Sequence, residues 1–183
     1  MSVSKLPEPT TYITTHDNDG KSIVLPPRTQ QWVTYDDGQM PWSVPYIAKM
    51  PADLNNDADL TDFDRKAAAG ELGLVSSDSA LLHYVDLAPG YTCMMHRTKS
   101  IDYGILLAGE VECVMDSGEV QAMKHGDVMV QRYTKHAWRN SSETEWARII
   151  FVLMDCLPLR VKGEVLGEDL GRGEAFVPSS ENA

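Results

Sequence analysis

Residues 90–109 read GYTCMMHRTKSIDYGILLAG, and residues 126–140 read GDVMVQRYTKHAWRN. Each segment sets histidine and other polar residues at fixed intervals among glycines and apolar, strand-forming residues. The residues that define the spacing are Gly90, His96, Thr98, Asp102 and Gly109 in the first segment, and Gly126, His136 and Asn140 in the second. Alternate residues of a strand face the same side, so His96, Thr98 and Asp102 are expected to share one face of a β structure.

Short apolar runs follow one another from residue 80 onward, and glycine or polar pairs separate most of them. They read ALLHYVDL, YTCMMHRT, DYGILLAG, EVECVMD, VQAMK, DVMVQR, HAWRN and EWARIIFVLMD. Strands at intervals of about eight to twelve residues predict a β-sandwich or a barrel. Upstream, residues 22–25, 31–35 and 44–50 are predicted as short strands set between prolines.

A single helix is predicted over residues 62–71, where DFDRKAAAGE combines alanines with charged residues. Asp62 is the expected N-cap, and Gly70 or Gly73 is the expected stop. With 183 residues and 20.3 kDa, the chain is expected to form one domain with a substantial core.

The two segments resemble the cupin signatures, written G-x5-H-x-H-x3-E-x6-G and G-x5-P-x-G-x2-H-x3-N. The first segment matches every interval but carries Thr98 at the second histidine position and Asp102 at the glutamate position. The second segment is one residue shorter between Gly126 and His136 than the second signature. The resemblance implies an all-β, single-domain cupin (jelly-roll β-barrel) with an N-terminal strand arm and one short helix. The expected boundaries are 1–73 for the arm, strands and helix, 74–160 for the barrel and 161–183 for the tail.

In the family these motif positions hold a divalent metal inside the barrel. The resemblance therefore implies His96, Asp102 and His136 as metal ligands, with His96 and His136 also catalytic. Two imidazoles and one carboxylate suit Fe(II), Zn(II) or Mn(II). The alternative is that the missing histidine and the shorter carboxylate mean a lost metal. His96 and His136 are then acid–base or pocket groups.

Four further residues are predicted to line a substrate pocket: Met94, Thr98, Trp138 and His83. Trp138 shares the strand parity of His136, and Met94 offers soft apolar lining. His83 lies in a strand that can line the same barrel, although a satisfied core or edge histidine is the favoured interpretation. Asn140 is expected to stabilise backbone, and Tyr103 to face outward.

The chain also resembles small single-cupin proteins of fungi and bacteria, several of which belong to polyketide or other secondary-metabolite pathways. This resemblance implies a metal-assisted lyase that decarboxylates, dehydrates or cyclises a small polyketide-like metabolite. Two alternatives stay open: an Fe(II)-dependent oxygenase on the same side chains, and a cupin that binds a small molecule without catalysis. Fold alone does not choose among them.

A net charge of −11 and a pI near 4.8 argue against nucleic acid or an anionic membrane as partner. No apolar run has the length of a membrane span or a secretory signal. The three scattered cysteines do not suggest a disulfide framework, so a reducing, cytoplasmic location is expected. Four apolar residues of the early strands predict a homodimer interface: Trp32, Trp42, Tyr46 and Ile47.

Overall fold

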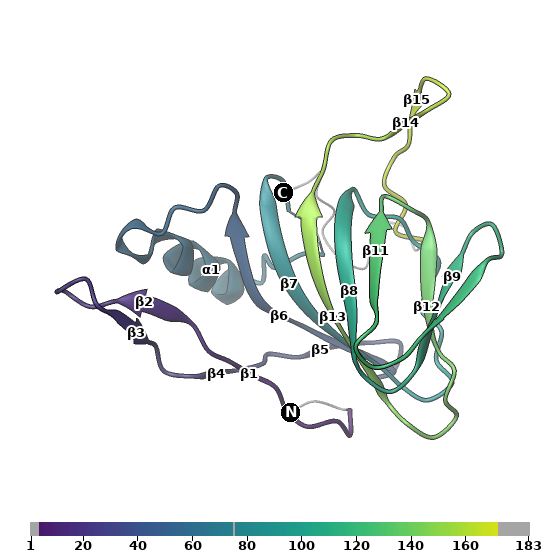
Figure 1. The fold of residues 1–183 in the computed structure, drawn as a ribbon, viewed down its shortest axis with the longest axis horizontal. Helices are drawn as coiled ribbons and strands as arrows, with labels where there is room; N and C mark the ends of the chain where they lie inside the picture. Colours follow the sequence, from purple (N-terminus) through teal and green to yellow (C-terminus); the bar gives the residue numbers. More distant parts are fainter. Residues whose placement is uncertain (1–3, 75, 172–183) are drawn as a thin grey trace.

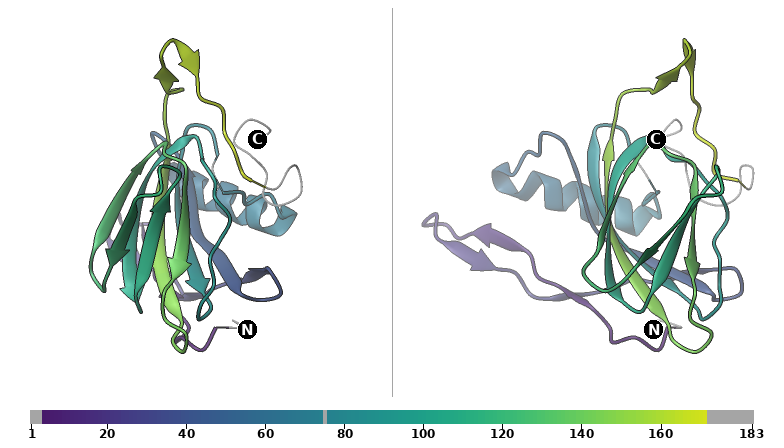
Figure 2. Two further views of the ribbon diagram at one scale, coloured as in Figure 1. Left: turned by 90° about the vertical axis from the view of Figure 1, so that its right-hand side faces the viewer. Right: turned by 45° about the vertical axis from the view of Figure 1, so that its right-hand side comes forward.

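A computed structural model describes residues 4–74 and 76–171. Seven strands form the barrel: β7 (Ser79–Leu87), β8 (Ser100–Ala108), β9 (Val111–Met115), β10 (Val120–Met123), β11 (Val128–Arg132), β12 (His136–Asn140) and β13 (Ala147–Asp155). A six-stranded antiparallel sheet, in which two upstream strands continue the order β11-β8-β13-β7, faces a three-stranded sheet in the order β10-β9-β12 (Figures 1 and 2). The predicted all-β barrel is confirmed.

Alternation along the central strands places the core between the two sheets. In β13, Ile149, Phe151 and Leu153 are buried, and the residues between them are half-buried. In β7, Leu81 and His83 point the same way, with 1% and 2% of their surface exposed. This period of two turns one face of each strand toward the barrel interior.

Strand β6 (Met40–Lys49) joins this sheet between β7 and β5 (Val33–Tyr35). The predicted start at residue 44 is wrong, because the strand runs through both Pro41 and Pro45. Its register with β7 shifts between Ser43 and Tyr46, so Pro45 lies where the hydrogen-bond ladder is already interrupted. Proline is tolerated at such irregular positions.

The predicted strand over residues 91–98 is also wrong, since that segment is irregular and touches the sheets only through isolated bridges. Two of these bridges join it to β12, at Thr92 with Arg139 and at His96 with His136. Too few consecutive pairs form for a continuous ladder, although the segment stays beside β12.

Helix α1 (Ala58–Ala69) follows a short 3₁₀ turn, η1 (Asn55–Asp57). It begins four residues before the predicted start, and Asp62 lies inside it, paired with Lys66. Asp57 occupies the N-cap with a left-handed φ of 53° and makes no side-chain capping bond. Gly70 ends the helix in the left-handed region at φ 69°, which confirms the expected stop.

The N-terminal arm comprises β1 (Thr10–Thr11), β2 (Thr14–His16), β3 (Ser22–Val24) and β4 (Arg28–Thr29). The β2–β3 hairpin extends away from the barrel, alongside α1 (Figure 1). Trp42 and Ile47 are only 7% and 3% exposed within this single chain. They are therefore core residues of the single chain, and the prediction that these two residues belong to a dimer interface is wrong.

Beyond β13 the chain forms a small hairpin, β14 (Arg160–Val161) and β15 (Glu164–Val165), and then returns to the barrel (Figure 2). We call residues 166–171 the strap. The backbone of Asp169 pairs with that of Arg97 through hydrogen bonds of 2.6 and 2.9 Å. Within residues 4–74 and 76–171, no helix has the length and hydropathy to cross a membrane.

Candidate active site

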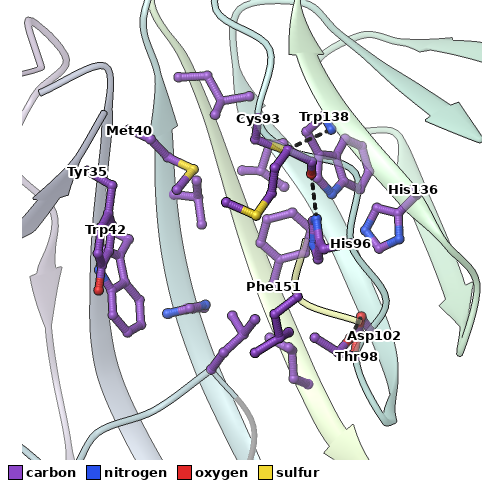
Figure 3. Close-up of a pocket in the computed structure, with 18 residues that line it drawn as sticks. Tyr35, Met40, Trp42, Cys93, His96, Thr98, Asp102, His136, Trp138 and Phe151 are labelled. Carbon is purple, nitrogen blue, oxygen red and sulfur yellow. Dashed lines mark hydrogen bonds between the residues drawn. The ribbon is translucent and has the colours of Figure 1, made fainter. Parts of the chain in front are cut away.

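A cavity inside the barrel contains about 950 Å³ not filled by protein atoms, including the part open to solvent. Its wall is formed by 18 residues, most of them apolar or aromatic (Figure 3). Five histidine, threonine and aspartate side chains bring polar groups to the wall: His83, His96, Thr98, Asp102 and His136. Tyr35, Trp42 and Cys93 add a hydroxyl, an indole N–H and a thiol. An apolar cavity with a few convergent polar groups is the usual form of a small-molecule site.

His96 and His136 form a side-by-side pair, with ring centroids 4.5 Å apart. The backbone fixes this proximity, because the two residues exchange hydrogen bonds of 2.8 and 2.9 Å as an isolated antiparallel bridge. His136 begins β12, while His96 comes from the irregular segment beside it.

Both rings are held in one tautomer. His96 Nδ1 lies 2.9 Å from the carbonyl oxygen of Met94, and His136 Nδ1 lies 2.9 Å from that of Thr134. A carbonyl only accepts, so each Nδ1 carries the proton and donates, which leaves a lone pair on each Nε2. Metal-ligating histidines are usually oriented in this way.

Burial keeps both imidazoles neutral. It lowers the pKa of His136 to about 3, with the neighbouring His96 adding to the effect, and it also lowers the pKa of His96. Near neutral pH both Nε2 lone pairs are therefore available to accept a hydrogen bond or to bind a cation.

Asp102 lies on the inner face of β8 and is 5% exposed. Its Oδ1 is buried without a hydrogen-bond partner, while Oδ2 accepts a long bond of 3.5 Å from Thr98 Oγ1. The hydroxyl of Ser100 donates to Thr98 Oγ1 at 2.8 Å. Burial raises the pKa of Asp102 to about 6, so its carboxyl can exchange a proton near neutral pH.

The donor atoms suit a divalent cation only in part. The Nε2 lone pairs of His96 and His136 fit one, and the unpaired Asp102 Oδ1 is a suitable third donor in kind. However, the described residues contain no group of three or more His, Cys, Asp or Glu side chains placed to hold a metal ion. The histidine pair fits a metal, and the participation of Asp102 stays a prediction.

The four predicted pocket residues, Met94, Thr98, Trp138 and His83, all lie on the cavity wall, and their roles stay predictions. Trp138 packs edge-on against His136, with centroids 5.7 Å apart. His83 packs edge-on against Trp42 at 4.3 Å. Asn140 Nδ2 donates to the backbone carbonyls of Leu87, Ala88 and Glu145, which agrees with its expected structural role.

The strap is a part of the site that the sequence did not indicate. Leu170 lines the cavity, and Asp169 accepts a 2.5 Å hydrogen bond from Lys135. Lys135 and Arg97, the two residues that hold Asp169, directly precede His136 and follow His96. The strap thus closes the wall beside the histidine pair through long-range pairing, for which the local sequence carries no periodic signal.

Sequence comparison finds relatives over nearly the whole chain. Phomopsin biosynthesis cluster protein D of Diaporthe leptostromiformis is 37% identical over 173 residues, which is 92% of this chain and 90% of that protein. Oryzines biosynthesis cluster protein J of Aspergillus oryzae is 36% identical, over 87% of this chain and 90% of that protein. The cupin-domain-containing oxidoreductase fogC of Aspergillus ruber is 35% identical, over 87% and 79%.

Among solved structures, a cupin-2 domain protein of Rhodospirillum rubrum superposes with a TM-score of 0.46 and 11% identity, over 84% of this chain and 78% of that chain. No family model matches the sequence. The family assignment therefore rests on the sequence relatives, together with the barrel and the two histidine-bearing segments. The chain belongs to the cupin family that includes the cupin-domain-containing proteins of fungi.

Proposed function

We propose that this protein is an enzyme of secondary metabolism that transforms a small, mostly apolar organic molecule inside the barrel. The observation that carries the proposal is the neutral His96–His136 pair, whose Nε2 atoms are free, at the wall of an apolar cavity. The pathway assignment comes from the relatives, two of which are named as biosynthesis cluster proteins.

The reaction we propose is a decarboxylation, dehydration or cyclisation, each of which requires a proton to move at a carbon or oxygen of the substrate. Asp102, with a pKa of about 6, is suited to give or take that proton near neutral pH. His96 and His136 would hold a zinc, manganese or iron(II) ion, which when bound polarises a substrate oxygen as a Lewis acid. The mostly apolar wall, to which Leu170 contributes, surrounds the reacting groups.

A second candidate is an oxidoreductase that uses iron(II) at the same side chains. The observation that favours it is the name of fogC and of three further relatives as cupin-domain-containing oxidoreductases. The two candidates differ in the metal required, because only a redox-active ion supports oxygen chemistry.

Metal content of protein purified without added metal tests the proposal. Iron supports the oxidoreductase, and zinc or manganese supports the lyase. In His96→Ala and His136→Ala the affinity for the metal is expected to fall by roughly 100-fold. The thermal melt of both variants is expected to match that of the wild type. Thr98→Ala is the matched control at the same wall, and it is expected to keep its metal.

Two outcomes contradict the metal assignment. Full occupancy in both histidine variants means that the ligands lie elsewhere. Absence of metal in a wild type that loses activity in both variants means that the histidines act as acid–base groups. Thr98→His adds the imidazole found at this position in the cupin signature, and it is expected to tighten metal binding.

We also propose a homodimer, through a surface other than the one expected from sequence. Four exposed apolar side chains lie on the outer face of β8 and the adjoining edge strand β11: Tyr103, Leu107, Val128 and Val130. Light scattering is expected to give about twice the chain mass of 20.3 kDa, and Val130→Glu is expected to return it to the monomer value. A monomer mass for the wild type contradicts this.

A further inference from the structure

His83 carries a buried polar atom that the protein does not satisfy. The residue is 2% exposed, and its Nε2 has no hydrogen-bond partner. The His83 side chain also forms part of the cavity wall. Buried polar atoms in folded proteins are nearly always paired, and an exception in a cavity wall calls for a ligand group to complete it.

The unsatisfied atom lies at the opposite side of the cavity from the histidine pair. His83 packs against Trp42, and Figure 3 shows Trp42 with Tyr35 and Met40 on one side and His96, His136 and Asp102 on the other. In the sheet, β13 separates the strand of His83 from that of Asp102. Two strand spacings amount to about 10 Å, the length of a two-ring aromatic molecule.

The surface between the two polar ends is apolar. Ile149, Phe151 and Leu153 of β13 form it, and all three line the cavity. A molecule that spans the cavity therefore needs an apolar middle and a hydrogen-bonding group at each end.

The substrate group that faces His83 is expected to be uncharged. Burial keeps the His83 imidazole neutral by lowering its pKa to about 3, and the lining residues include no lysine or arginine. A carboxylate or phosphate at this end would be buried without a counter-charge. A hydroxyl or carbonyl oxygen pairs with a neutral imidazole, which can accept or donate.

We propose that His83 is a specificity-determining residue, whose Nε2 binds a hydroxyl or carbonyl oxygen at the far end of a two-ring-sized, uncharged substrate. This inference rests on the proposed function, because it takes the His96–His136 side of the cavity as the reacting end. It identifies the substrate class as an oxygenated aromatic or similarly flat molecule.

The test uses two probes of similar size, 2-naphthol and 2-methylnaphthalene. The first carries a hydroxyl group where the second carries a methyl group. The measured quantity is the ratio of their dissociation constants, determined by NMR titration. His83→Leu is expected to lower the preference for the hydroxyl about tenfold relative to wild type, since it removes one hydrogen bond. His83→Gln, which retains hydrogen-bonding capacity, is expected to keep most of the preference.

Val85→Ala is the matched control, because Val85 is the next inward-facing residue of β7 and carries no polar group. It is expected to change the binding of both probes alike and to leave the ratio unchanged. His136→Ala is also expected to retain the ratio, since it alters the other end of the cavity.

An unchanged ratio in His83→Leu, with both probes still bound, overturns the role of His83 and leaves the proposed function standing. Binding of neither probe to the wild type overturns the proposed pocket and this inference together. If His83→Leu does not fold, the ¹⁵N resonance of His83 Nε2 in labelled wild-type protein decides. A shift on addition of 2-naphthol supports the proposal, and no shift overturns it.

Discussion

Buried polar groups are paired on the outer face of strands β7 and β13, but one is left unpaired on the inner face of β7. On the outer face, Asp86 and Arg148 are partners in the strand register, and their side chains are 0% and 7% exposed. Arg148 Nε and Nη2 each donate to the Asp86 carboxylate at 2.6 Å, and Nη1 donates to the Pro7 carbonyl at 2.6 Å. On the inner face of β7, His83 Nε2 has no partner.

The outer arrangement is a complete polar cluster that fastens the N-terminal arm to the sheet. The Trp32 ring lies 5.2 Å from the guanidinium carbon of Arg148 and so shields the pair from solvent. The cavity side instead leaves three buried atoms unpaired, Trp42 Nε1, His83 Nε2 and Asp102 Oδ1, and all three residues line the cavity. This difference is expected if the outer polar groups serve the fold and the inner ones bind a ligand, as we propose.

Breaking the outer cluster is expected to have the largest effect on stability. Arg148→Met removes the cation and leaves the Asp86 carboxylate buried without a partner. Such a change lowers the free energy of unfolding by about 3–5 kcal/mol. The melting temperature, measured by circular dichroism, is expected to fall by roughly 10 °C.

A double variant separates the charge effect from the packing effect. Arg148→Met combined with Asp86→Leu replaces both charges with apolar groups, and it is expected to recover most of the lost stability. If Arg148→Met alone melts like the wild type, the outer pair is not a structural cluster, and the contrast between the two faces fails.

The second prediction concerns Asp102 in metal-free protein. Its pKa rises from 3.8 in the unfolded chain to about 6 in the folded protein, a difference of about 2 units at roughly 1.4 kcal/mol each. Below pH 3.8 the carboxyl is protonated in both states. As pH rises from about 4 to about 6, only the unfolded state ionises freely, so the free energy of unfolding falls by about 3 kcal/mol.

Asp102→Asn is expected to lose this pH dependence, as measured by urea unfolding across pH 4–7. The comparison also tests the third metal ligand. If Asp102 binds a cation together with the histidine pair, added metal favours its ionised form and flattens the wild-type curve. A wild-type curve that is already flat without metal contradicts the raised pKa.

The third prediction concerns the apolar surface between the two polar ends. A Cβ at Gly104 would lie 2.8 Å from Cε1 of Phe151 and 3.6 Å from Cη2 of Trp138. Gly104→Ala therefore displaces the Phe151 ring, and it is expected to destabilise the protein by about 1–3 kcal/mol. It should also weaken 2-methylnaphthalene binding. Gly118→Ala is strained at φ 91° but meets no atom within 4 Å, and it should leave that binding unchanged.

Much of the barrel could be predicted because its signals are local. Alternation and turn spacing marked the strands from β7 to β13, and Gly70 marked the end of the helix. The start of the helix was missed because Asp57 and Asp62 are both favourable capping residues by type, and the sequence does not show which of them begins the helix. Strand β6 was predicted too short because Pro41 suggested a break that the sheet accommodates.

The site was predictable where motif spacing fixes residues on neighbouring segments, as for His96 and His136. The strap was not, since Asp169 reaches Arg97 through a contact between distant parts of the chain. The unpaired Nε2 of His83 could not be predicted either, because it depends on whether the residues packed around it provide a hydrogen-bond partner. Sequence places a histidine on a face, and only packing determines whether its nitrogen finds a partner.

His83→Leu is expected to change stability least, and it tests most directly whether the inner and outer polar residues have different roles. If the fold requires its imidazole as it requires Arg148, His83→Leu destabilises the protein by several kcal/mol. If Nε2 is kept for a ligand, the change removes an unsatisfied polar atom, a gain of about 1–3 kcal/mol. It also removes the edge-on contact with Trp42, a loss of about 0.5–1.5 kcal/mol. The two nearly offset each other, so the ligand-free variant should melt within about 3 °C of the wild type or slightly above it. A loss of more than about 2 kcal/mol would make His83 a structural residue like Arg148.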